Sequence, residues 1–101
     1  MNTSISSTDF GVEQVCLVVE ISRPELIQVI ELGIVEPPGD APENWVFDSH
    51  MLSVLRRATR LHRQLEVSWP GIALAMQLLE EVEQLQTENQ RLRQRLQRFI
   101  R

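Results

Sequence analysis

Residues able to perform acid–base or metal chemistry are few in this chain, and they form no catalytic pattern. The two histidines, His50 and His62, have no cysteines or carboxylates at metal-site spacing around them. The sequence contains no glycine-rich phosphate loop, no nucleophile motif and no paired-carboxylate signature. It therefore predicts a protein that is not an enzyme, with no catalytic residue, no metal site and no cofactor.

Charge is distributed very unevenly along the 101 residues, whose formal net charge is −4. Residues 1–50 carry nine acidic side chains and one arginine, a net charge of −8, whereas residues 51–101 carry nine arginines and five glutamates, a net charge of +4. An acidic half of this kind predicts a face that meets a basic partner rather than phosphate.

The compartment predicted from the sequence is the cytoplasm. Cys16 is the single cysteine, so no internal disulfide can form, and its place on an apolar helical face indicates buried filler rather than a reactive thiol. No apolar run is long enough to cross a bilayer, and the first ten residues lack the basic and apolar regions of a signal peptide.

The central pattern is a capped helix over residues 22–33. Ser22 and Glu25 form a capping box, Pro24 suits the first helical turn, and Gly33 suits a left-handed C-terminal cap. Apolar residues at helical spacing predict a preceding helix over 12–19. Two short helices joined by a tight turn are typical of a helix-turn-helix.

The segments around this pair complete the expected fold. Residues 4–10 could form an edge strand or a disordered tail, and residues 34–35 and 45–47 predict a small wing of two or three strands. Asp48 is a suitable N-cap for a helix over 49–65, and Ser68 for one from about 69 to the end. The arginine stripe from Arg56 to Arg63 is either a solvated helix face or a site for an acidic partner or nucleic acid.

The last helix has the strongest periodicity in the chain. Apolar residues and one asparagine alternate in steps of four and three as a heptad seam: Leu78, Val82, Leu85, Asn89, Leu92, Leu96 and Phe99. We expect this seam to form a homodimer, although docking on the protein's own domain remains an alternative. The predicted domains are therefore 1–76, a winged helix-turn-helix, and 77–101, a coiled-coil-type helix.

The direction of the helix pairing is open. Asn89 at a buried position and a possible Glu88–Arg93 pair are compatible with a parallel dimer. However, three glutamates at 80, 81 and 83 precede four arginines at 91, 93, 95 and 98, and an antiparallel pair would place acid against base.

Several segments carry a resemblance to a known family. The helix-turn-helix and wing look like MerR-type regulators. The segments Cys16-Leu17, Ile21-Ser22, Leu32–Pro37, Trp45–Asp48, Trp69–Ala73, Glu88-Asn89 and Leu92–Leu96 together resemble the CbpM family of chaperone modulatory proteins. The resemblance implies a mainly α, MerR-like fold and a bacterial inhibitor that binds the J-domain of the DnaJ-like co-chaperone CbpA. Binding would block stimulation of the Hsp70 chaperone DnaK and the DNA binding of CbpA.

The residues themselves favour a protein partner over DNA. Base reading needs side chains such as Arg, Asn or Gln, and the second helix offers only Arg23 and Gln28, while the wing loop has no cation. A MerR-like transcription regulator is the alternative function. The residues predicted to bind the partner are apolar anchors and carboxylates: Ile27, Glu31, Glu36, Asp40, Glu43 and Trp45. Trp45 could equally be a core residue, and each carboxylate could be ordinary solvated surface.

Overall fold

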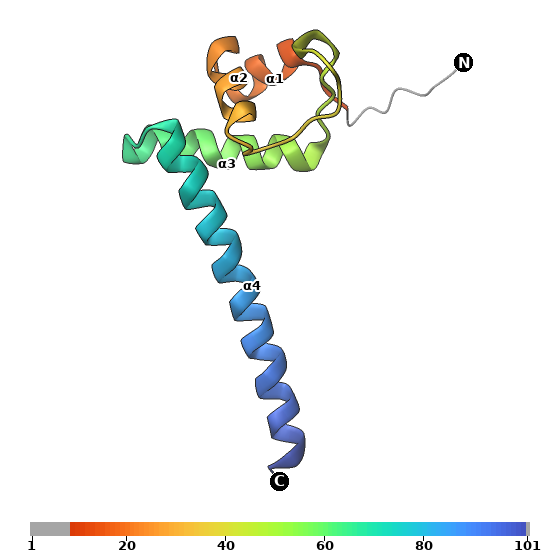
Figure 1. The fold of residues 1–101 in the computed structure, drawn as a ribbon, viewed down its shortest axis with the longest axis vertical. Helices are drawn as coiled ribbons and strands as arrows, with labels where there is room; N and C mark the ends of the chain where they lie inside the picture. Colours follow the sequence, from red (N-terminus) through yellow and green to blue (C-terminus); the bar gives the residue numbers. More distant parts are fainter. Residues whose placement is uncertain (1–8, 101) are drawn as a thin grey trace, which may run out of the picture.

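The computed structural model describes residues 9–100, and this part of the chain is built from helices. They are α1 (Val12–Val19), α2 (Arg23–Glu31), the 3₁₀-helix η1 (Pro42–Asn44), α3 (Ser49–Leu65) and α4 (Trp69–Phe99). Helices α1 and α2 lie on one side of α3 (Figure 1). We call these three helices and the segments that join them the head domain, and α4 extends away from it as a long single helix. The predicted helices over 12–19 and 49–65, and the helix from 69 onward, are confirmed.

Helix α2 has the start and stop signals that its sequence predicts. The backbone N–H of Glu25 donates to Ser22 Oγ over 3.2 Å, and Glu25 Oε1 accepts from the Ser22 backbone N–H over 3.4 Å. At the other end, Gly33 has φ +81°, which only glycine adopts readily. The Gly33 and Ile34 N–H groups donate to the Ile30 and Val29 carbonyls, as in a Schellman motif.

The predicted wing of two or three strands is wrong. Within residues 9–100 the only strand-like pairing is an isolated antiparallel bridge in which Phe10 and Phe47 exchange two backbone hydrogen bonds of 2.8 Å. The backbone N–H groups of residues 45–47 donate to the carbonyls of Pro42, Pro38 and Phe10, so none of them pairs with residues 34–35. Residues 4–8 of the other predicted strand lie outside the described residues.

The core lies between the helices of the head domain and reaches the first turns of α4. Its fully buried side chains come from every part of that domain and are Val15, Leu26, Val29, Phe47, Leu55, Ala58 and Ile72. Phe47 therefore belongs to the core instead of a wing. Burial of so many apolar side chains from separate segments holds α1, α2 and α3 in one fixed arrangement.

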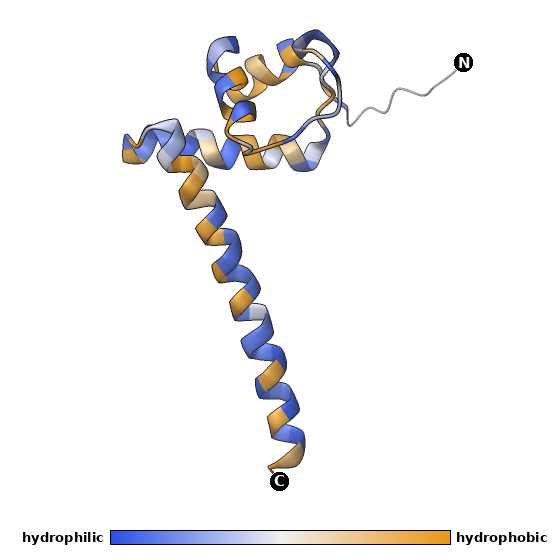
Figure 2. Ribbon diagram, viewed as in Figure 1, coloured by the Kyte–Doolittle hydropathy of each residue, from blue (hydrophilic) through white to orange (hydrophobic). Residues whose placement is uncertain are grey.

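The chain beyond Met76 has no such packing. Every residue of α4 from Gln77 to the end of the helix is exposed. Apolar and polar bands alternate along it, as Figure 2 shows. The seam residues Leu85, Leu92 and Phe99 are 63%, 55% and 85% exposed, so the head domain of the same chain does not cover them.

Candidate functional site

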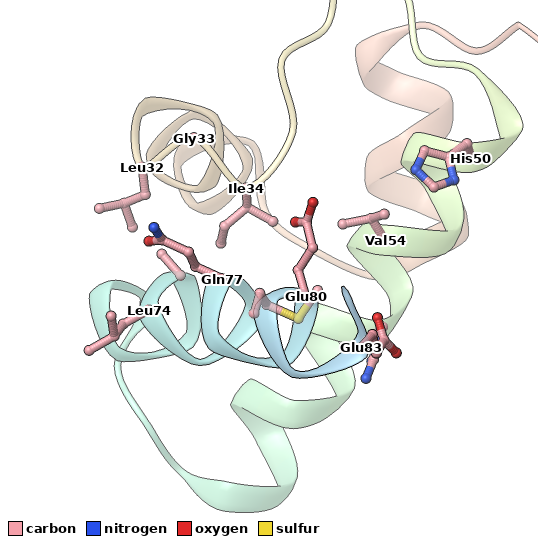
Figure 3. A pocket seen from close by; sticks show the side chains of 12 residues that line it. Leu32, Gly33, Ile34, His50, Val54, Leu74, Gln77, Glu80 and Glu83 are labelled. Carbon is pink, nitrogen blue, oxygen red and sulfur yellow. The ribbon is translucent and has the colours of Figure 1, made fainter. Parts of the chain in front are cut away.

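A groove of about 670 Å³ lies where the end of α2, the first half of α3 and the first turns of α4 meet (Figure 3). Arg57 and His50 also line it, but we call it the acidic groove and define it by its apolar and acidic side chains: Leu32, Ile34, Val54, Leu74, Met76, Glu80 and Glu83. Apolar side chains beside carboxylates suit a ligand that is itself both apolar and cationic.

Local structure explains how the acidic groove is built. The turn at Gly33 ends α2 and leaves Leu32 and Ile34 on the wall of the groove, opposite Leu74 (Figure 3). Arg57 Nη1 of α3 lies 3.9 Å from Glu83 Oε2 of α4, but both side chains are about half exposed or more. This ion pair therefore contributes little stability, and Glu83 remains available to a partner.

Two of the predicted partner-binding carboxylates flank the acidic groove in the sequence. Glu31, the last residue of α2, directly precedes Leu32, and Glu36 follows Ile34 by two residues. Both carboxylates are exposed. Ile27 is partly buried one helical turn before Glu31, so the two share a face of α2.

The other predicted residues, Asp40, Glu43 and Trp45, lie in the loop around η1. This loop is at the α1 end of the head domain, away from the end of α2 (Figure 1). Asn44 Nδ2 donates to Asp40 Oδ1 over 2.9 Å, and this hydrogen bond lowers the pKa of Asp40. Trp45 is partly buried, with its ring edge-on to Phe47 and 6.5 Å between ring centroids. The structure therefore divides the predicted residues into two groups.

A polar cluster that the sequence did not single out joins three helices. The rings of His62 and Trp69 stack with centroids 4.0 Å apart, so Trp69 at the start of α4 packs on α3. Trp69 Nε1 donates to Glu25 Oε2 over 3.3 Å, and His62 Nδ1 donates to the Val67 carbonyl over 2.6 Å. The residues come from α2, α3 and α4, so their meeting depends on the tertiary fold.

Glu25 is the charged member of this cluster. Partial burial raises the pKa of its carboxyl, but hydrogen bonds from Ser22 and Trp69 outweigh that effect and leave the pKa below its ordinary value. Glu25 therefore stays ionised as both a cap of α2 and an acceptor for Trp69, which is a structural role.

A reactive thiol, a metal site and a membrane-spanning helix are absent from the described part of the chain. Burial raises the pKa of the Cys16 thiol more than Arg23 lowers it, so the thiol stays protonated, as expected for apolar filler. Across residues 9–100, no three His, Cys, Asp or Glu side chains gather as metal ligands. No helix among these residues combines the length and apolarity needed to span a membrane.

Comparisons with known proteins agree with this architecture. Residues 10–94 match the family described as "MerR HTH family regulatory protein". The chain is 51% identical over 84 residues to a protein of Pseudomonas entomophila, with 83% of each chain covered. It is 44% identical over 91 residues to a protein of Escherichia coli O1:K1 / APEC, with 90% of each chain covered. Both relatives are named chaperone modulatory protein CbpM, a regulatory role. The chain therefore belongs to the MerR HTH family and to the CbpM family of chaperone modulatory proteins.

Proposed function

We propose that this chaperone modulator inhibits the DnaJ-like co-chaperone CbpA by binding its J-domain. Binding would prevent the J-domain from stimulating DnaK and would also block DNA binding by CbpA. The observation that carries the proposal is the acidic groove, whose apolar side chains and carboxylates suit a basic helix. J-domains, as the family resemblance implies, present such a helix to DnaK.

The helix-turn-helix surface supports a protein partner. Helix α2 carries the exposed side chains Arg23, Gln28 and Glu31, and the following loop exposes Glu36, Asp40 and Glu43 without any cation. A carboxylate that faces a phosphate is repulsive and releases no counterions on binding. The same carboxylates attract a basic helix, speeding its encounter with the protein.

The proposed interface has two parts. Glu31, Glu36 and the acidic groove would receive the cations and apolar side chains of the J-domain helix. The loop with Asp40, Glu43 and Trp45 would contact a separate part of the J-domain, since it lies at the other end of the head domain (Figure 1). Trp45 keeps enough exposed surface to contribute an apolar contact.

A homodimer through α4 is the second part of the proposal. The exposed seam from Leu78 to Phe99 has the heptad spacing of a two-stranded coiled coil. Exposed leucines repeated over three heptads would be covered by the same seam of a second copy. The dimer would present two acidic grooves to its partners.

The test is an ATP hydrolysis assay with purified DnaK, CbpA and this protein. We expect CbpA-stimulated hydrolysis to fall to the basal rate of DnaK as this protein is added. Basal hydrolysis without CbpA should not change, which serves as the control. Full stimulation at saturating amounts of this protein would refute the proposal.

The acidic surface makes a sharper prediction. The double variant Glu31→Lys with Glu36→Lys should weaken J-domain binding roughly tenfold, because attraction to a basic helix becomes repulsion. Isothermal titration calorimetry with the isolated J-domain measures this change. The control variant, Glu13→Lys with Glu66→Lys, makes the same charge change at other exposed positions. Unchanged affinity in a folded Glu31/Glu36 variant would remove this surface from the mechanism.

A MerR-like DNA-binding regulator is the second candidate, favoured by the family match over residues 10–94. A gel shift on genomic and nonspecific DNA at about 50 mM salt discriminates the two functions. Binding that falls steeply as salt is raised would favour the regulator. We expect no shift.

A further inference from the structure

A second cavity, of about 360 Å³, lies between the C-terminal end of α1 and α3. Arg56, Arg60 and Arg63 line it and follow one another at spacings of four and three, so they share one face of α3. We call these three residues the cationic face. The acidic groove uses a different face of α3, that of Val54 and Arg57, so the two sites are separate.

A buried hydroxyl group in the lining of this cavity has no partner. Thr59 is only 4% exposed, and among residues 9–100 its Oγ1 atom finds no hydrogen-bond partner. Because this atom exposes less than 1 Å² of surface, Thr59 forms part of the cavity wall, and the charged groups that a ligand meets there are the three arginines.

The arginines are arranged to receive an anion. Arg63 donates to the backbone carbonyl of Glu20, the left-handed residue with φ +62° that ends α1, and this contact fixes its guanidinium beside the cavity. Arg56 and Arg60 are exposed and form no ion pair with any residue that the structure describes. Guanidinium groups of this kind bind carboxylates in a bidentate manner.

An exposed apolar side chain lines the cavity beside the cationic face. This residue is Val18, which is 43% exposed. A nucleic-acid backbone offers nothing apolar to Val18. A polypeptide can satisfy both features at once.

We propose that the cationic face binds an acidic peptide segment carrying an apolar side chain. The carboxylates of the segment pair with Arg56 and Arg60, and its apolar side chain packs on Val18. This site is independent of the J-domain interface, because the acidic groove selects ligands of the opposite charge. One chain can therefore hold a basic and an acidic partner at different faces of α3.

The experiment uses the full-length protein and a fluorescein-labelled helical peptide of about twelve residues, in which glutamate and leucine share one face. Fluorescence anisotropy should show binding, and Arg60→Glu should weaken it roughly tenfold by turning attraction into repulsion. The matched control is Arg98→Glu, which makes the same charge change at an exposed position near the end of α4 and should alter affinity less than about twofold. Circular dichroism verifies that both variants are folded.

Two further ligands separate the possible outcomes. A peptide with glutamine in place of glutamate, and one with alanine in place of leucine, should each bind more weakly than the original. Equal losses for Arg98→Glu and Arg60→Glu would overturn the proposal, since they would indicate only general charge attraction. Absence of peptide binding, or binding of a DNA duplex in preference to the peptide, would also overturn it. J-domain affinity of Arg60→Glu should stay unchanged, which keeps this test distinct from that of the proposed function.

Discussion

The side chain of Glu25 contacts residues of three different helices. Its Oε1 atom caps α2 by accepting from Ser22, while its Oε2 atom accepts from Trp69 Nε1 and lies 3.9 Å from His62 Nε2. The carboxylate therefore links the start of α2 to the ends of α3 and α4 that meet it. When His62 is protonated, the last contact becomes an ion pair.

Stability should depend on the charge of Glu25. We expect Glu25→Gln to lower the free energy of unfolding at pH 7 by roughly 0.5–1 kcal/mol, a modest value because the side chain is 43% exposed. A lowered pKa stabilises the folded state above the ordinary value of 4.5, and this contribution is lost as the pH falls through the lowered pKa. Urea denaturation at pH 7 and at a series of lower pH values measures the difference, which should shrink as the pH falls below 4.5 and vanish once Glu25 is protonated in the folded state.

The control is Glu13→Gln, which removes a first-turn carboxylate from α1. Glu13→Gln should lower the free energy of unfolding at pH 7 by less than Glu25→Gln does. It removes only a charge from the first turn of α1. A difference for Glu25→Gln that persisted undiminished at the lower pH values would mean that packing, and not the carboxylate charge, stabilises this cluster.

The N-cap residues of α3 and α4 hold the same position before a helix, but only one of them forms a capping hydrogen bond. Asp48 and Ser68 both precede a helix with extended backbone, as the sequence predicts. Asp48 Oδ1 accepts from the Met51 N–H over 2.8 Å, whereas the Ser68 side chain makes no capping hydrogen bond. Helix α4 begins with Trp69 and Pro70 instead, and the buried Trp69 ring anchors that end.

Replacement of the two caps should therefore have unequal effects. We expect Asp48→Ala to lower the free energy of unfolding by about 1 kcal/mol and Ser68→Ala by less than about half of that. Thermal and urea unfolding of the two variants at pH 7 measure the difference. Equal losses would contradict the capping assignment at Asp48.

In the whole molecule, a packed head domain contrasts with a helix that has no packing partner along most of its length. Helix α4 adds apolar surface at Leu78, Leu85 and Leu92 that the chain itself leaves exposed. The dimer proposed here would cover this surface, and the direction of the pairing would decide whether the two head domains lie together or apart. That arrangement would set the distance between the two acidic grooves.

Leu85→Ser with Leu92→Ser should convert the dimer to a monomer while the head domain stays folded. Loss of two buried leucines from each chain should raise the dissociation constant roughly 100-fold or more. Analytical ultracentrifugation measures it. The control, Gln84→Ser with Arg91→Ser, changes positions just outside the seam and should remain dimeric. A wild-type chain that sediments as a monomer would refute the dimer.

Cross-linking gives the direction of the pairing. In a Cys16→Ser background, a short thiol cross-linker should join two Leu96→Cys chains in a parallel pair. In an antiparallel pair it should join Leu96→Cys to Leu78→Cys, since opposite ends of the seam then meet. The acidic and basic ends of α4 favour the second result.

The helices and their ends follow from local signals in the sequence. The Ser22–Glu25 capping box, Gly33 and Asp48 act within a few residues, so α2 and α3 could be bounded from local hydrogen-bonding capacity. The relation to chaperone modulatory proteins was also recognisable from short segments such as Trp45–Asp48. The seam in α4 could be identified because periodicity is a property of one helix.

The course of the loop after α2 and the positions of the sites depend on how distant segments pack. Residues 34–35 and 45–47 look like strands, but the N–H groups of 45–47 donate elsewhere, and Phe47 pairs with Phe10 while its side chain enters the core. The acidic groove and the cationic face each combine residues from helices distant in sequence. Contacts of that kind depend on how helices pack, and a sequence pattern records only which face of each helix is apolar.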